Sequence, residues 1–147
     1  MKILSVIAGA VFLLSVSVFC HADEINPKID GRWAVIGFEF ARISGMDEKE
    51  AKSFLGQELE KDKGFLVSPF GSCNFCSLNV TYQKVKTDDL LNEDFNFQEL
   101  KFPRGYVLVH ELSWGNSQYL TMYQVDTNLA YVPMDGVFFL MKRNVKR

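Results

Sequence analysis

The feature of this sequence that most limits its fold is a series of short apolar segments, closely spaced and separated by turn residues. Residues 106–113 and 118–125 are the clearest of them, and alternating apolar and polar side chains over residues 78–83 mark another. Further strands are expected over residues 31–40, 57–60, 65–70, 129–133 and 137–142. Such short connections favour antiparallel pairing, because parallel strands need long crossovers. The expected fold is therefore mainly β, a small antiparallel barrel or a strongly curved sheet.

Turn and capping residues indicate how these strands are connected. Asp135 and Gly136 suit a tight hairpin that needs positive φ, and residues 114–117 form the loop of another hairpin. One amphipathic helix is expected over residues 47–55, capped by Asp47 or Ser44, and a second short helix over residues 88–92, capped by Thr87. The sheet is thus expected to carry one or two short helices.

The last expected strand, residues 137–142, has apolar side chains on both faces. An apolar strand of this kind promotes aggregation if it lies at an open edge of a sheet. We therefore expect the sheet to close so that this strand is not left open.

Residues 1–22 resemble a secretory signal peptide. Lys2 provides the positive start, residues 3–19 are apolar, and small residues occupy the two positions that signal peptidase reads. Cleavage is expected before Asp23, which leaves one β domain over residues 23–147. The alternative is an uncleaved anchor, for which the apolar run is at the short limit. We expect a bacterial protein that is periplasmic or secreted and is not attached to the membrane after cleavage.

The composition excludes several classes of function. The chain is 48% hydrophobic with a net charge of -2, which argues against nucleic-acid binding through bulk positive charge. Its paired carboxylates, such as Asp88 and Asp89, lie on a polar face, and the sequence has no G-x-S-x-G motif. The sequence therefore predicts no catalytic residues and no nucleic-acid partner.

Cys73 and Cys76 are the only thiols that remain after cleavage. An oxidising compartment favours a disulfide between them. The alternative is a thioredoxin-like redox centre, which needs its first cysteine at the start of a helix. Here Cys76 leads into an expected strand, so we predict a structural disulfide. Two thiols cannot supply a zinc site of four cysteines.

His110 is the only histidine of the mature chain and falls within an expected strand, on the face of Leu108 and Leu112. The side chain of Glu111 points to the opposite face, so the two neighbours cannot act as an acid–base pair. A second histidine for a metal site is absent from the mature sequence. We interpret His110 as a hydrogen-bonded interior residue and expect neither a metal nor a cofactor.

Gly31-Arg32-Trp33, at the start of the first expected strand, resembles the G-x-W start of lipocalin-like barrels. Residues 136–143, an apolar run that ends in basic residues, resemble the last strand of small exported bacterial members. The resemblance implies that the barrel is closed by Trp33 and a basic residue, Arg143 or Lys142, in a cation–π contact. It also implies binding without chemistry.

The hairpin loop and the strand that follows it offer a possible recognition edge. Trp114, Asn116, Tyr119 and Tyr123 would form it, because aromatic anchors dominate the energetics of interfaces. The alternative is that Trp114 folds back and plugs one end of the barrel.

Three functions remain open on the sequence alone. The first is an exported, non-enzymatic binding protein whose lipocalin-like barrel holds a small apolar or amphipathic ligand. The second is a periplasmic inhibitor or immunity protein that blocks a cell-wall hydrolase or a secreted effector. A redox or hydrolytic enzyme is the third, and it is the least supported because no catalytic set is present.

Overall fold

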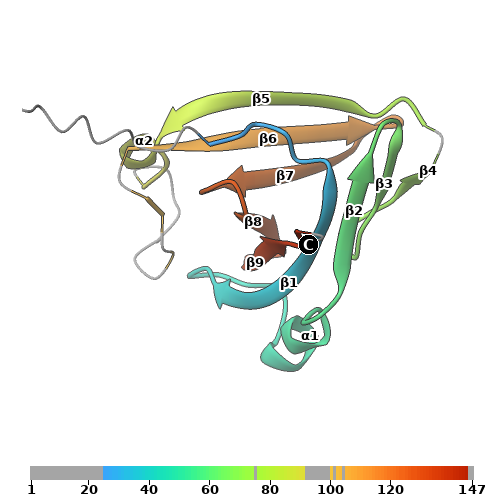
Figure 1. Ribbon diagram of the computed structural model, residues 1–147. Helices are drawn as coiled ribbons and strands as arrows, with labels where there is room; N and C mark the ends of the chain where they lie inside the picture. Colours follow the sequence, from blue (N-terminus) through green and yellow to red (C-terminus); the bar gives the residue numbers. More distant parts are fainter. Residues whose placement is uncertain (1–24, 75, 92–99, 101, 104, 146–147) are drawn as a thin grey trace, which may run out of the picture.

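The computed structural model describes residues 25–74, 76–91, 100, 102–103 and 105–145. The expected signal peptide and its cleavage site lie outside the described residues. Nine strands form one sheet that curls into a half-barrel, with every neighbouring pair antiparallel (Figure 1). The prediction of a mainly β, strongly curved sheet is therefore confirmed.

The elements follow the expected segments closely. The strands are β1 (Gly31–Phe40), β2 (Glu58–Asp62), β3 (Phe65–Val67), β4 (Cys73–Asn74), β5 (Asn79–Lys86), β6 (Tyr106–Trp114), β7 (Gln118–Gln124), β8 (Leu129–Met134) and β9 (Val137–Arg143). The helices among the described residues are α1 (Glu48–Ser53) and α2 (Thr87–Leu91). The order across the sheet is β4-β3-β2-β1-β9-β8-β7-β6-β5. Only β4, which is very short, was not expected.

The last strand lies inside the sheet. β9 pairs with β1 on one side and with β8 on the other, and Val137, Phe138 and Phe139 are all buried. The sheet as a whole is not a closed barrel, however, because β4 and β5 remain its two edge strands. Pairing on both sides thus protects β9 without full closure.

The concave face of the sheet holds the main core. Side chains from strands near the two opposite edges of the sheet, β3 and β4 at one edge and β6 near the other, belong to the same cluster. This is possible only on the inside of the curl. The buried members include Trp33, Val35, Leu59, Leu66, Cys73, Leu112, Trp114, Met122, Val132, Phe139 and Met141. The inward positions are therefore filled by large apolar side chains.

A second apolar cluster covers the convex face over β6, β8 and β9. Its buried members are Val107, Val109, Val125, Tyr131 and Phe138. Leu90 of α2 and Phe102 pack against it, and the rings of Phe102 and Tyr131 lie 5.5 Å apart. The two faces of β9 are thus buried by different parts of the chain.

Helix α1 covers one end of the curl. Asp47 caps it, as expected, because its carboxylate accepts a hydrogen bond from the Glu50 amide at 2.8 Å. Phe54 at its end packs against Phe139 of β9 and Phe70, with ring centroids 4.8 and 5.8 Å away. These aromatic contacts fix the helix to the core.

The expected cap of the second helix is different. Thr87 is the first residue of α2, and its hydroxyl donates to the carbonyl of Pro103 at 2.8 Å. Thr87 therefore lies inside the helix instead of before it, and its hydroxyl joins α2 to a segment distant in sequence.

Candidate functional site

Trp33 and Arg143 close one end of the curl. The Trp33 side chain is fully buried, and the guanidinium carbon of Arg143 lies 4.3 Å from the centre of its ring. The indole nitrogen donates to the carbonyl of Ile29 at 3.0 Å. Lys142, the basic residue that precedes Arg143, is exposed. The structure thus places Arg143, not Lys142, over Trp33.

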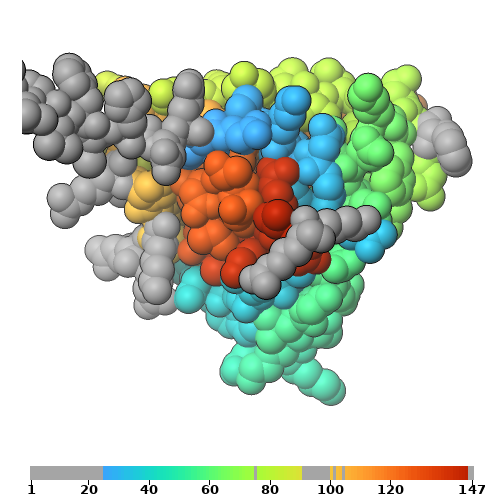
Figure 2. All heavy atoms as spheres, in the orientation of Figure 1, coloured from blue at the N-terminus to red at the C-terminus, as the bar shows by residue number. Residues whose placement is uncertain are grey.

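Arg143 also holds the segment that precedes β1. Its guanidinium donates to the carbonyls of Asp30 at 2.8 Å and Thr127 at 3.1 Å, and to that of Lys28. Desolvation lowers the pKa of Arg143 from its ordinary value, although arginine stays protonated in proteins. Figure 2 shows the blue N-terminal part of the chain beside the red last strand. This end of the curl is occupied by structural contacts.

The Cys73–Cys76 pair is a disulfide, with 5.7 Å between the Cα atoms, as predicted. Cys73 belongs to strand β4 and is buried, so it does not lie at the start of a helix. The dipole that lowers the pKa of a redox cysteine is therefore missing. The bridge fastens an edge of the sheet.

His110 is fully buried and belongs to a chain of hydrogen bonds. Its Nε2 lies 2.8 Å from Oε1 of Gln124, whose amide nitrogen donates to the carbonyl of Asn26 at 2.9 Å. Because that amide oxygen can only accept, Nε2 carries the proton. Nδ1 has no hydrogen-bond partner among the described residues. The arrangement ties β6 and β7 to the segment before β1.

This burial predicts a pH-dependent stability. Desolvation lowers the pKa of His110 from 6.5, the hydrogen bond that His110 donates to Gln124 raises it, and Arg143 and Lys61 lower it further. As the pH falls below 6.5, the unfolded chain binds a proton that the folded chain does not, so stability is lost, at most about 1.4 kcal/mol per pH unit.

The check is urea denaturation of wild type and His110→Gln between pH 7.5 and 5.5. We expect the advantage of the wild type over the variant to shrink as the pH falls. Contributions from carboxylates cancel in the comparison, since both proteins share them. Parallel stability curves for the two proteins would contradict the lowered pKa.

A groove opens where β7 and β8 separate. The two strands pair only at Tyr123 with Tyr131 and at Gln124 with Ala130. Continuing the same register places Pro133 opposite Thr121, and proline has no N–H with which to continue the ladder. Pro133 thus gives a physical reason for the separation of the strands.

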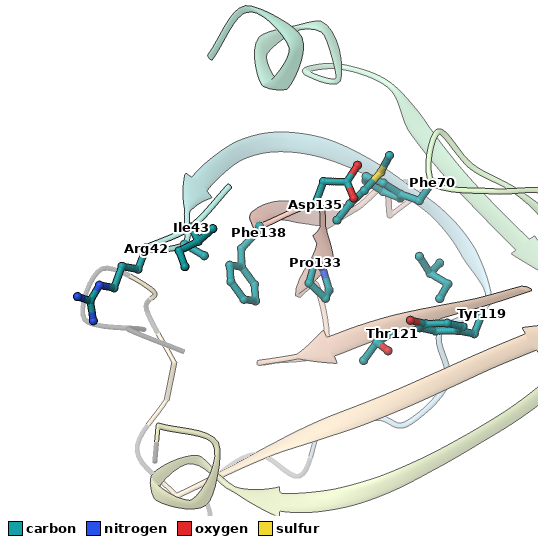
Figure 3. A pocket seen from close by; sticks show the side chains of 12 residues that line it. Arg42, Ile43, Phe70, Tyr119, Thr121, Pro133, Asp135 and Phe138 are labelled. Carbon is teal, nitrogen blue, oxygen red and sulfur yellow. The ribbon is translucent and has the colours of Figure 1, made fainter. Parts of the chain in front are cut away.

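The groove has a volume of about 850 Å³. It is lined by Ala41, Arg42, Ile43, Phe70, Tyr119, Leu120, Thr121, Pro133, Met134, Asp135, Gly136 and Phe138. Figure 3 shows Tyr119 and Thr121 on β7, facing Pro133 and Phe138 across the opening. Two apolar side chains at its margin are largely exposed, Ile43 at 83% and Tyr119 at 76%.

The structure separates the four residues of the expected recognition edge. Tyr119 lines the groove, and Asn116 is exposed in the hairpin loop. Tyr123 instead packs on the convex face, 6.3 Å from the Phe102 ring. Trp114 is only 7% exposed and belongs to the concave core, so its place in an exposed edge is corrected. Its indole fills the space beside Gly71, as in the alternative interpretation.

Sequence reasoning missed the groove. Ile43 belongs to a loop with no motif, and its exposure depends on how that loop packs against the β8–β9 turn. Pro133 was a usable signal, because proline inside an expected strand marks a place where pairing ends.

Among the described residues, no group of three histidine, cysteine, aspartate or glutamate side chains is arranged to hold a metal ion. No helix in the described part of the chain is long and apolar enough to cross a membrane. Family models, curated proteins and solved structures contain no match to this chain, so the groove itself is the basis for a functional assignment.

Proposed function

We propose that this chain is an exported, non-enzymatic binding protein whose groove between β7 and β8 takes an apolar or amphipathic ligand. The observation that carries the proposal is the contrast between the filled concave core and the open groove. A volume of about 850 Å³ lies within the range of ligand sites, about 300–1,000 Å³. The Cys73–Cys76 disulfide supports an oxidising compartment and hence export.

The proposed ligand site differs from the interior site that a lipocalin-like barrel implies. In such a barrel the ligand lies inside, but here Trp33, Trp114 and Phe139 occupy the concave face. Close-packed cores hold few voids larger than a water molecule. The groove at the margin of the sheet is the better candidate.

A second candidate is an inhibitor or immunity protein that blocks a cell-wall hydrolase or a secreted effector. The exposed Tyr119 and Ile43 favour it, since exposed apolar side chains around a groove also serve as anchors for a protein partner. Inhibition of a basic lysozyme by the wild type, but not by Tyr119→Ser, would support this candidate.

The groove is tested with the fluorescent amphipathic probe anilinonaphthalene sulfonate. We expect saturable binding to the wild type and affinity at least about fivefold lower in the Ile43→Ser/Tyr119→Ser double variant, because two apolar contacts are lost. Both side chains are exposed, so the fold should be retained. Val145→Ser, at another largely exposed apolar position (67%), is the matched control and should bind like the wild type. Equal affinity in all three proteins would place the ligand elsewhere.

A further inference from the structure

We propose that the natural occupant of the groove is an extended polypeptide segment that adds as a strand along β7, in the space that β8 leaves. This inference rests on the proposed function, because it names the class of ligand for the same groove. It follows from the main-chain pairing of the two strands, independently of the apolar side chains.

Along a strand, the main-chain N–H and C=O groups of successive residues point alternately to its two neighbouring strands, and this shows which groups of β7 face the groove. The amide of Val125 donates to the carbonyl of Leu129, so odd-numbered residues of β7 direct their main-chain groups toward β8. Tyr123 is the last such residue with a register partner on β8. The next two odd-numbered residues are Thr121 and Tyr119, and both line the groove. They form a local strand edge inside the sheet.

This edge suits a polypeptide better than a small apolar molecule. Main-chain N–H and C=O groups are obligatory hydrogen-bonding groups, and a strand laid beside them satisfies them by the ladder pattern. On the β8 side, Pro133 has no N–H to offer, so that side provides mainly apolar contact. The added strand therefore pairs with β7 and packs against β8.

The side chains of the groove indicate what the segment carries. Successive side chains of a strand point to opposite faces. One face of the added strand would lie toward Phe70, Leu120 and Met134 at the margin of the concave core, and the other toward Tyr119 and Phe138. We therefore expect a segment with an apolar side chain at every second position, directed at the concave side.

The experiment begins with a random library of twelve-residue peptides displayed on phage. It is selected on wild type and depleted on the Ile43→Ser/Tyr119→Ser variant. Synthetic copies of the enriched peptides are then methylated at one backbone nitrogen at a time. Strand addition predicts losses of about tenfold at alternate positions and small changes between them, because only every second N–H faces β7. Hydrogen exchange of the Thr121 amide should slow at least tenfold when the peptide binds.

Two outcomes would overturn strand addition and leave the proposed function standing. One is that the dye binds the groove while no peptide is enriched. The other is that peptides bind without a period of two in the methylation series and without protection of Thr121. Failure of the dye and the peptides together would overturn the groove as a binding site. Val145→Ser should select the same peptides as the wild type.

Discussion

Replacing Gly136 by alanine is expected to lower the free energy of unfolding by about 2–4 kcal/mol, from left-handed strain and overpacking together. Gly136 has φ of +78° in the β8–β9 turn, and an added Cβ would lie 2.2 Å from the carbonyl oxygen of Ile43. That atom belongs to the main chain, which cannot rotate away as a side chain could. The 41–45 loop would have to shift. Urea denaturation at neutral pH, followed by tryptophan fluorescence, measures the loss.

Gly64→Ala is the matched control. Gly64 also has positive φ, +69°, but nothing lies within 4 Å of its added Cβ. Only the conformational strain remains, so we expect a loss of about 1 kcal/mol. Equal losses at the two positions would mean that the contact with Ile43 contributes nothing. Because Ile43 lines the groove, Gly136→Ala should also weaken dye binding, whereas Gly64→Ala should not.

Arg143→Met is expected to cost about 2–3 kcal/mol of stability, from the cation–π contact and the lost hydrogen bonds. Methionine can cover the Trp33 ring but cannot donate to the carbonyls of Asp30 and Thr127. The segment before β1 would then lose its attachment to the last strand. Denaturation in urea, together with faster amide exchange over residues 26–30, would report both effects.

Lys142→Met provides the comparison for this change. Lys142 is the neighbouring basic residue, is exposed, and has no ion pair among the described residues. A surface substitution of this kind changes stability by about 0.5 kcal/mol or less. If the two variants were equally stable, the closure of this end of the curl would not depend on Arg143.

Much of the fold could be predicted because local patterns determine it. The Asp135-Gly136 turn needs positive φ at both positions, and the structure has it. The cap at Asp47 and the period-two pattern around His110 were likewise readable from a few adjacent residues. Each of these signals depends on chemistry within one element and its ends.

The remaining features depend on contacts between distant segments. The register of β1 shifts between Val35 and Gly37, which leaves Ile36 half exposed in an apolar strand. The residues on either side of Val35 and Gly37 contain no pattern that predicts this bulge. Pro133 marks locally where pairing can end, but the groove itself depends on β8 lying beside β7 and on Pro133 falling opposite Thr121, which no single segment of the sequence shows.

The position of β9 between β1 and β8 has a consequence for biosynthesis. A ribosome makes β1 first and β9 last, yet the two strands are neighbours in the finished sheet. Until β9 emerges, β1 and β8 have no partner to join them, and pairing of residues so distant in sequence is slow. The nascent chain therefore cannot complete its sheet before β9 has left the ribosome. Stop codons that remove residues 137–147 should yield an aggregating product instead of a shortened, folded one.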